Sequence, residues 1–476
     1  MVIFVKFRNA CEQIYLANPS KNYYKPRTRN TLCHKEIIMK KIRLYLEISA
    51  AVLVIAAVVW IFFGNYLELG KPVIKLDHDI TAVGKQKTIE IIFSDSQSGL
   101  SHLSVEIIQD NKGQILADKK IPARGIKQET LSLTLNMGDL KLHDGPAAIK
   151  ITAEDHSLFK NQAIVSQTIK IDTVPPQINL LKNMNYINQG GTGFVAYDSS
   201  KIIASTGVYV NDYFTPGYPV RSGNKTSYAT YFAVPMDADK AKTRIMIFAR
   251  DEAGNETKMA LPCVIKKKKF RADKMNLSED FLRQKMPEFQ AMLTSLQGKT
   301  PLEVFAYINS QTRNDNFLTI QKICQKSSPK ELWEGTFLRL KNGAPMALFG
   351  DKRTYMIDKK VIGDSIHSGI DLASTAHADI EASNKGIVVF AGPLGIYGNA
   401  IIIDHGLGLF SLYGHLSSII TTVGKNVAKG EKIGLSGTSG LAGGDHLHFS
   451  ILAGGQFVNP EEWWDPHWIK DNINRQ

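Results

Sequence analysis

An uncharged apolar run near the N-terminus constrains this chain most, because such a run suits a lipid bilayer better than a water-soluble fold. It reads ISAAVLVIAAVVWIFFG over residues 48–64, and Leu44 and Leu46 lengthen it when Glu47 lies at the membrane interface. A helix needs about 17 to 25 apolar residues to cross a membrane. The run therefore predicts one membrane-spanning helix.

The charges around this run predict its orientation. Lys40, Lys41 and Arg43 stand directly before it, and positive charge is sparser after it. Because positively charged flanks stay on the cytoplasmic side, we expect residues 1–43 in the cytoplasm, a transmembrane helix at 44–67 and all later residues outside. This predicts a single-pass protein of the inner membrane whose main part is periplasmic or extracellular.

The beginning of the chain leaves two alternatives open. A cleaved signal peptide needs small residues at its cleavage site, whereas this run ends in the bulky residues Trp60 to Phe63, so an uncleaved anchor is favoured. Met39 precedes two lysines and resembles a natural translation start, which would make residues 1–38 an upstream extension. The sequence does not decide between Met1 and Met39.

Length and composition indicate several folded domains. The chain has 476 residues, and single hydrophobic cores stop growing at about 250 to 300 residues. The formal net charge of +12 favours contact with anionic polymers. Part of the excess lies in Lys266 to Lys269, and no nucleic-acid-binding motif accompanies it. We therefore expect no nucleic-acid partner.

The cysteines do not form a metal or redox motif. Cys11, Cys33, Cys263 and Cys324 include no C-x-x-C pair, which argues against a cysteine zinc knuckle and a thioredoxin-like motif. Cys263 and Cys324 lie on the same predicted side of the membrane, where oxidising conditions would allow a disulfide between them. The sequence leaves that disulfide open.

Two stretches after the membrane segment predict β-sandwiches. In the first, residues 72–174, short runs such as Thr88–Phe93 and Ala147–Thr152 alternate apolar and polar residues. The second, residues 175–268, closes with the turn D-E-A-G-N at 251–255. Both resemble tandem bacterial immunoglobulin-like domains, in which a D-x-x-G-N turn and a T-x-P-P junction recur. The resemblance implies that both are spacers or stalks.

Residues 269–333 have a helical character. The sequence T-P-L-E at 300–303 combines an N-cap hydroxyl, a proline at the first helical position and a capping-box glutamate, which predicts a helix to about Ser310. An earlier helix is expected to begin near Ser278 and to be interrupted by Pro287. We interpret the segment as a connector packed on the next domain, and an autoinhibitory role stays open.

Three histidine clusters follow in the C-terminal region. One places His367 four residues before Asp371, and another places His446 two residues before His448. Residues an even number apart on a strand face the same side, so each pair can converge on one ion. The third cluster contains His415, after the apolar stretch AIIID.

The residue types in these clusters suit catalytic zinc. Imidazole and carboxylate groups are zinc ligands, and a catalytic site takes three protein ligands and leaves one position for water. Two histidines and one aspartate meet that requirement. Bound water then has a pKa of ~7, and the remaining histidines can serve as acid and base near neutral pH.

The C-terminal region resembles the lysostaphin and LytM-type zinc endopeptidases, which act on peptidoglycan. The shared pattern reads H-S-G-I-D-L at 367–372, Y-G-N-A-I-I-I-D-H-G at 397–406, L-Y-G-H-L-S at 412–417, V-A-K-G-E-K-I-G-L-S-G-T-S-G at 427–440 and H-L-H-F at 446–449. By position, the resemblance implies one Zn²⁺ per chain, with metal ligands His367, Asp371 and His448. It implies His415 and His446 as the catalytic residues that hold the attacking water and stabilise the tetrahedral intermediate.

Some positions depart from the family pattern or surround it. Asp445 stands where members commonly have proline, and we interpret His377 and Asp379 as surface residues. Arg353 and Tyr355 are candidates to line the cleft. Further expectations are a turn at Asp404 and His405, cleft-wall loops at 395–398 and 437–444, and C-terminal packing by Trp463, Trp464 and Trp468.

The predicted fold is therefore multidomain and mainly β: a transmembrane helix, two immunoglobulin-like β-sandwiches, a helical connector, and an antiparallel β-rich LytM-like peptidase domain at 334–476. The predicted function is zinc-dependent hydrolysis of peptide cross-links between peptidoglycan stem peptides. Two alternatives stay open: a non-hydrolytic peptidoglycan-binding scaffold or amidase activator, and a protease for a protein or pilin substrate. The sequence identifies neither the cross-link, nor protein partners, nor the oligomeric state.

Overall fold

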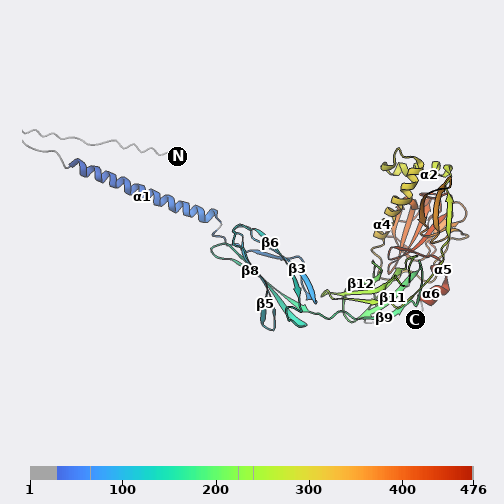
Figure 1. The fold of residues 1–476 in the computed structure, drawn as a ribbon, viewed down its shortest axis with the longest axis horizontal. Helices are drawn as coiled ribbons and strands as arrows, with labels where there is room; N and C mark the ends of the chain where they lie inside the picture. The colour runs from blue at the N-terminus through green and yellow to red at the C-terminus, as the bar shows by residue number, and fades with distance from the viewer. Residues whose placement is uncertain (1–28, 65, 223–224, 240, 474–476) are drawn as a thin grey trace, which may run out of the picture.

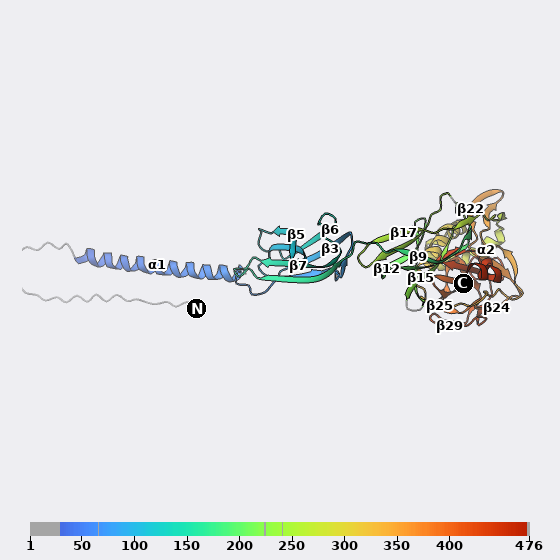
Figure 2. The ribbon, with the colours of Figure 1, turned by 90° about the horizontal axis from the view of Figure 1, so that it is seen from below.

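A computed structural model describes residues 29–64, 66–222, 225–239 and 241–473. The molecule is elongated, with the helix α1 at one end, a first β-module beside it, and a second β-module against the C-terminal domain at the other end (Figure 1). The view turned by 90° gives the same order (Figure 2). The prediction of a mainly β, multidomain chain with an apolar helix and a helical connector is thus confirmed.

The helix α1 (Arg29–Phe63) contains the apolar run. Residues Glu36–Phe62 have a mean hydropathy of 2.4, and the rest of the protein does not bury them. This length and composition suit a membrane span, although a signal sequence meets the same criteria. The helix ends at Phe63, earlier than predicted. The choice between Met1 and Met39 as the start concerns residues that lie mostly outside the described part of the chain. The orientation across a membrane stays a prediction.

The first β-module has two sheets around one apolar core. The larger sheet has the strand order β2-β8-β7-β4-β5 and the smaller one β1-β3-β6. Ile91 and Phe93 on β3 face Ile149 and Ile151 on β7 in this core, because alternate residues of a strand point to the same side. The strands are β1 (Val73–Leu76), β2 (Ala82–Val83), β3 (Gln86–Ser94), β4 (Leu100–Gln109), β5 (Lys112–Lys120), β6 (Gln128–Asn136), β7 (Gly145–Asp155) and β8 (Gln162–Ile171).

The second β-module repeats this arrangement. Its sheet β13-β12-β16-β17 corresponds to β5-β4-β7-β8 of the first module, and β9-β11-β15 corresponds to β1-β3-β6, all with antiparallel pairing. The strands are β9 (Ile178–Asn183), β10 (Tyr186–Asn188), β11 (Thr192–Ser199), β12 (Ile203–Val210), β13 (Tyr213–Pro216), β14 (Tyr218–Ser222), β15 (Lys225–Ala233), β16 (Ile245–Asp251), β17 (Glu256–Ala260) and β18 (Val264–Lys266). The immunoglobulin-like assignment of both modules and the predicted domain boundaries stay predictions.

An aromatic cluster joins the second module to the C-terminal domain. Tyr231 packs against Trp463 and Trp333, with ring centroids 5.4 Å and 6.5 Å away. The indole of Trp463 is fully buried and donates a 3.0 Å hydrogen bond to Thr192 Oγ1. Glu462 accepts a 2.8 Å hydrogen bond from the Thr192 N–H. The predicted packing of Trp463 is confirmed. These contacts hold the second module against the C-terminal domain more tightly than a simple spacer would be held.

The connector consists of α2 (Glu279–Met292), α3 (Pro301–Tyr307), a π-helical turn η2 (Ile308–Thr312) and α4 (Arg313–Ile323). The predicted capping box is present, since Thr300 and Glu303 exchange side chain to backbone hydrogen bonds. Two expectations are wrong. The helix continues through η2 beyond Ser310, and Pro287 lies inside α2 without ending it, because it is on the exposed side where water can satisfy the freed carbonyl.

The C-terminal domain is built on one large sheet with the order β20-β23-β31-β27-β26-β25-β29, to which β32 adds beside β31. The strands that carry the histidine clusters lie in its middle. Its other strands form the sheets β24-β30-β28 and β19-β21-β22, and β19 comes from the connector. Bounds are β19 (Ala272–Asn276), β20 (Ala344–Ala347), β21 (Lys352–Ile357), β22 (Lys360–Ile366), β23 (Ile370–Ala373), β24 (Asp379–Glu381), β25 (Gly386–Pro393), β26 (Asn399–Gly406), β27 (Leu409–Leu416), β28 (Ser418–Ile419), β29 (Asn426–Val427), β30 (Lys432–Leu435), β31 (Leu447–Ala453) and β32 (Gln456–Val458).

Short helices complete the domain: η1 (Thr294–Leu296) in the connector, η3 (Gly395–Tyr397), and the C-terminal α5 (Glu461–Trp464) and α6 (Pro466–Asn472). Cys263 and Cys324 are both free thiols in the structure. They lie in different hydrophobic clusters, so the disulfide that the sequence left open is not formed.

The aromatic cluster predicts coupled unfolding. Trp463→Ala should cost about 3 to 5 kcal/mol, because it removes a large buried side chain from a core that the second module and the C-terminal domain share. Calorimetry should detect one joint transition for these two parts, at a lower temperature in the variant. Leu181→Ala, at an exposed leucine on β9, is the control and should change little. Independent melting of the second module, unaffected by Trp463→Ala, would contradict the shared core.

Candidate active site

Three neighbouring strands bring the histidine clusters together. β23 pairs antiparallel with β31 so that Asp371 lies opposite His448. On the other side of β31, β27 pairs so that Gly414 lies opposite His448, which places His415 next to the same point. His367 stands just before β23. The register of the central sheet therefore assembles residues that are far apart in the sequence.

The side chains of His367, Asp371 and His448 converge on one point. His367 Nε2 lies 3.0 Å from Asp371 Oδ1, His448 Nδ1 lies 2.9 Å from the same oxygen, and the two nitrogens are 3.1 Å apart. All three residues are buried, with 6%, 9% and 4% of their surface exposed. Candidate ligand atoms of the three lie within 4.8 Å of one another. The geometry can hold one metal ion.

The outer contacts of the two imidazoles fit a metal site. His367 Nδ1 lies 3.0 Å from the Leu348 carbonyl oxygen, and His448 Nε2 lies 2.9 Å from Ser450 Oγ. A carbonyl only accepts, so Nδ1 of His367 carries the proton and its Nε2 presents a lone pair to the site. Metal-bound histidines are commonly oriented in this way through the second ring nitrogen. Two imidazole nitrogens and one carboxylate oxygen are a donor set that suits zinc.

The other two histidines lie at the rim of this group. His415 Nδ1 donates to the Ser439 carbonyl at 2.8 Å, and His446 Nδ1 donates to the Gly444 carbonyl at 2.8 Å. Their ring centroids are 4.8 Å apart. His446 Nε2 is 3.6 Å from Asp371 Oδ1. In both rings Nδ1 is therefore occupied by a backbone carbonyl, and Nε2 is the nitrogen that can exchange a proton with substrate or water.

A β-bulge directs His415 into the site. Between β26 and β27 the pairing steps from Asn399 with Leu416 to Ile401 with Tyr413, so β27 has one residue more than β26 at this point. His415 has a φ of 62°, a left-handed conformation that is uncommon for residues other than glycine. Such bulges and strained residues often occur beside active sites. Sequence alternation alone did not reveal the bulge.

The local environment separates the pKa values of these groups. Burial lowers the pKa of His415 to about 3 and that of His448 to about 4, so both are neutral imidazoles at pH 7. Burial also lowers the pKa of His446, but the neighbouring Asp371 carboxylate outweighs it and raises that pKa. Burial would raise the pKa of Asp371, but hydrogen bonds with the histidines hold it well below its ordinary value.

A cleft of about 530 Å³ leads to these residues. Arg353 and Tyr355 line it, and Arg353 Nη2 lies 3.2 Å from Asp371 Oδ2. The connector supplies one wall, and the loops predicted as walls supply another. The lining residues are Met275, Asn276, Leu277, Ser278, Phe281, Phe305, Arg313, Met346, Ala347, Arg353, Tyr355, His367, Ser368, Asp371, Ile396, Tyr397, His415, Leu441, Gly443, His446 and His448.

Sequence reasoning missed several residues around the cleft. Tyr397 is buried, its hydroxyl lies 3.0 Å from Ser368 Oγ, and its ring centroid is 5.3 Å from that of His448. Arg313 follows the π-helical turn and lines both this cleft and a neighbouring cavity of about 720 Å³. Tyr397 belongs to the family-like stretch at 397–406, which was a usable signal. No local pattern pointed to Arg313.

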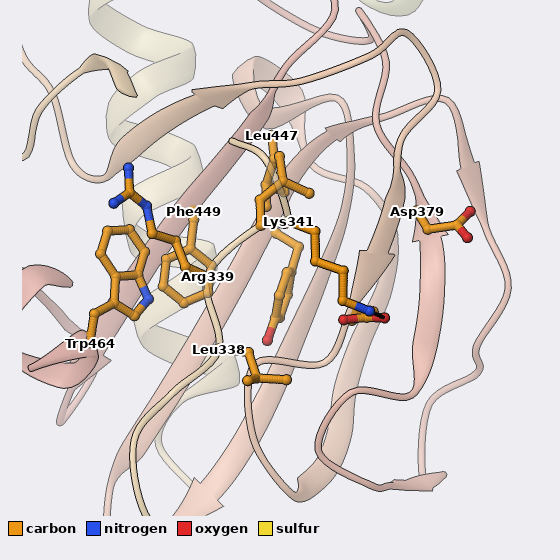
Figure 3. A pocket seen from close by; sticks show the side chains of 10 residues that line it. Leu338, Arg339, Lys341, Asp379, Leu447, Phe449 and Trp464 are labelled. Atoms are coloured by element: carbon orange, nitrogen blue, oxygen red, sulfur yellow. Dashed lines mark hydrogen bonds and ion pairs between the residues drawn. The ribbon is translucent and has the colours of Figure 1, made fainter. Parts of the chain in front are cut away.

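The opposite face of β31 is apolar and supports the site from behind. Leu447 and Phe449 alternate with the histidines and line one pocket with Trp464 and Arg339, and Phe449 lies beside the Trp464 ring (Figure 3). Phe449 stacks on Trp464 with centroids 5.4 Å apart, and the Arg339 guanidinium lies 5.2 Å from the Trp464 ring centroid. Packing on this side fixes the direction of the histidines on the other.

The remaining departures have structural roles. Asp445 accepts hydrogen bonds from the His377 backbone and from Ser436 Oγ, so it ties the loop before β31 to its neighbours. His377 is exposed, as predicted. His405 is fully buried within β26 and contacts the Lys385 carbonyl and Ser411 Oγ. Asp404 and His405 lie at the end of β26, as predicted, and Asp404 Oδ1 accepts a 2.8 Å hydrogen bond from the Gly406 N–H, where the turn to β27 begins.

Comparison with known proteins agrees with this geometry. Residues 365–460 match Peptidase family M23. The C-terminal domain belongs to this family. The matched residues include all five histidine and aspartate positions described above, and M23 is the family of the lysostaphin and LytM-type enzymes.

Curated relatives of this M23 domain include two named endopeptidases. The DD-carboxypeptidase/endopeptidase Mpg of Neisseria meningitidis is 43% identical over 20% of this chain and 22% of its own length. The peptidoglycan DD-endopeptidase ShyA of Vibrio cholerae is 30% identical over 36% of this chain and 37% of its own length. The chain thus spans well under half the length of these relatives. The solved catalytic domain of lysostaphin from Staphylococcus simulans is 26% identical, with a TM-score of 0.24, over 28% of this chain and 98% of that one.

The contact between Ser450 and His448 predicts an effect on metal affinity. Ser450→Ala should weaken zinc binding about 10- to 100-fold, because the His448 ring loses the hydrogen bond that orients it. Competition with a chromophoric chelator measures the change. Ser374→Ala, at a partly exposed serine outside the histidine clusters, is the control. Equal zinc affinity in Ser450→Ala and the wild type would rule out this orienting role.

Proposed function

We propose that this protein is a zinc-dependent endopeptidase that hydrolyses peptide cross-links of peptidoglycan. The observation that carries the proposal is the buried group of His367, Asp371 and His448 at the base of a cleft, with His415 and His446 at its rim. Membership of the C-terminal domain in family M23 supports it.

One zinc ion per chain is proposed, held by His367 Nε2, a carboxylate oxygen of Asp371 and His448 Nδ1. When bound, zinc supplies Lewis-acid polarisation of the scissile carbonyl and makes water acidic enough to ionise near neutral pH. Arg353 positions the Asp371 carboxylate through its 3.2 Å contact. The Leu348 carbonyl and Ser450 hold the two rings in their metal-binding orientation.

His415 and His446 are proposed to move and hold protons. His415 is neutral, with its pKa lowered by burial to about 3, so its free Nε2 can accept a hydrogen bond from the attacking water. The raised pKa of His446 favours an N–H at Nε2 that can donate to the developing oxyanion. Neighbouring groups with pKa values pushed apart in this way are typical of acid and base pairs.

The cleft suits a flexible peptide that carries carboxylates. Its lining contains Arg313 and Arg353, and Asp371 is its one carboxylate among the described residues. Arg313 Nε is buried without a hydrogen-bond partner, and Arg313 Nη2 donates a 3.1 Å hydrogen bond to Asn309 Oδ1. Stem peptides carry free carboxylates near their cross-links. Since Mpg and ShyA are named for action on DD bonds, we propose DD cross-links as the first substrates to test.

The location is part of the proposal. The apolar helix α1 is proposed to anchor the chain in the inner membrane, with its N-terminus cytoplasmic and residues after 67 in the compartment that contains peptidoglycan. The first module separates α1 from the C-terminal domain along the length of the molecule (Figure 1). An anchored enzyme of this shape reaches the wall at a distance from the membrane surface.

The main alternative is a non-hydrolytic scaffold that binds peptidoglycan or activates an amidase. Such a scaffold has no need of metal ligands or proton-transfer groups, whereas this chain retains all five residues in converging positions. A protease acting on a protein or pilin substrate is the other alternative. Product analysis on purified sacculi distinguishes it.

The assigned roles predict two classes of variant. His448→Ala and Asp371→Ala should remove both zinc and activity, since each deletes a ligand. His415→Ala should reduce hydrolysis at least ~100-fold while most zinc remains, because it deletes a general base and no ligand. Zinc content by elemental analysis and turnover of muropeptides are measured on the same samples. Equal loss of zinc in both classes would show that the roles are wrongly assigned.

The substrate proposal predicts cleavage of defined cross-linked muropeptides and a role for Arg313. Arg313→Met should raise KM about 10-fold or more, because charge-assisted contacts to a carboxylate are lost. Arg283→Met, at an exposed arginine of α2, is the matched control. Mass spectrometry of the digest identifies the bond. A zinc-loaded protein that releases no product from any cross-linked muropeptide would favour the scaffold.

A further inference from the structure

A second cluster of buried acidic residues lies far from the M23 site, in the first β-module. Glu68, Asp95 and Asp155 are 3%, 4% and 1% exposed. One carboxylate oxygen of each lies within 4.8 Å of the others. Carboxylates are almost never this buried without a partner of opposite charge, because their desolvation costs several kcal/mol each.

The cluster joins the segment after α1 to the first module. Glu68 lies between α1 and β1, Asp95 follows β3, and Asp155 ends β7. Asn161 Nδ2 donates to both the Glu68 carbonyl at 2.9 Å and Asp155 Oδ2 at 2.8 Å. The Ser98 N–H donates to Glu68 Oε2 at 2.7 Å. These contacts tie Glu68 to Asp155 and to the loop after Asp95, but they add no positive charge.

Two oxygens of this region lack any hydrogen-bond partner. Asp95 Oδ2 and Ser98 Oγ have no hydrogen-bond partner, and water does not reach them, because their residues are only 4% and 2% exposed. Among the residues that the structure describes, no lysine or arginine forms an ion pair with Glu68, Asp95 or Asp155. Unpaired, buried oxygens beside concentrated negative charge favour the binding of a cation.

The second module shows what fills the corresponding place. Asp172 is the counterpart of Glu68, because each lies four residues before a proline, Pro176 and Pro72 respectively. Asp251 is the counterpart of Asp155, because each ends its strand, β16 and β7 respectively.

A lysine occupies that place in the second module. Lys201 follows Asp198 by three residues, as Ser98 follows Asp95 in the first module. The Lys201 ammonium group contacts Asp172 Oδ1, the Val174 carbonyl and Asp251 Oδ2. The second module therefore neutralises its acidic cluster with its own side chain. The first has serine at this position.

We propose that Glu68, Asp95 and Asp155, with Ser98 beside them, form a Ca²⁺ site. Ca²⁺ takes about six to eight oxygen ligands in flexible geometry, which carboxylates, a hydroxyl, carbonyls and water can provide, and extracellular sites of this kind have a Kd of ~10⁻⁴ to 10⁻³ M. Mg²⁺ demands a tighter octahedron and keeps its water. The ion braces the junction between α1 and the first module, as Lys201 braces the junction between the two modules.

The test uses the full chain in detergent, loaded with zinc so that the M23 site is occupied. Isothermal titration calorimetry should detect one Ca²⁺ per chain. Scanning calorimetry should show the first-module transition rising by about 10 °C at a Ca²⁺ concentration 100-fold above Kd. Mg²⁺ alone, added to a parallel sample, should bind at least 10-fold more weakly. Absence of Ca²⁺ binding to the wild type would overturn the proposal, and tighter binding of Mg²⁺ would overturn the assignment to calcium.

Two variants make the test specific to this cluster. Ser98→Lys imitates the second module, so it should abolish Ca²⁺ binding and leave the first-module transition independent of Ca²⁺. Asp155→Asn should weaken Ca²⁺ binding at least 10-fold and serves if the lysine variant does not fold. Wild-type Ca²⁺ affinity in either folded variant would contradict the site. Zinc content and hydrolysis should stay unchanged, so failure here is distinct from failure of the proposed peptidase activity.

Discussion

The antiparallel register between β23 and β31 is the constraint on which the site depends. It places Asp371 opposite His448, and β27 on the far side of β31 adds His415. A shift of one residue would turn every side chain of β31 to the other face and send the histidines into the apolar core. Phe449, which stacks on Trp464, and the buried Leu447 oppose that shift, because their burial requires the present register.

Support for this register extends beyond the C-terminal domain. Trp463 and Tyr231 bury the second β-module against the sheet that carries the candidate metal site, and the connector strand β19 pairs with β21 beside the cleft. Positions held by packed strands are more exact than positions on loops. The strained φ of His415 is maintained within this frame, since the residues around it are buried.

Much of the site could be predicted because its candidate metal ligands lie in short local patterns. His446 and His448 face one side of the chain at the start of β31, and His367 precedes β23 by only a few residues, so each pair could be recognised locally. Their meeting at one point depends on the register of β23, β31 and β27. Arg313 could not be predicted, because a π-helical turn in the connector brings it to the cleft. The joint core of the second module escaped prediction for a similar reason: Tyr231 and Trp463 meet only through tertiary packing. The Pro287 expectation failed because an exposed proline leaves water to solvate the freed carbonyl.

X-ray absorption at the zinc edge of the purified protein tests the central claim most directly. The account predicts one zinc per chain with two imidazole nitrogens at about 2.0 to 2.1 Å, carboxylate oxygen at about 2.0 to 2.2 Å, a further light-atom ligand and no sulfur. A spectrum with sulfur ligands, or with a single imidazole, would contradict a site made by His367, Asp371 and His448.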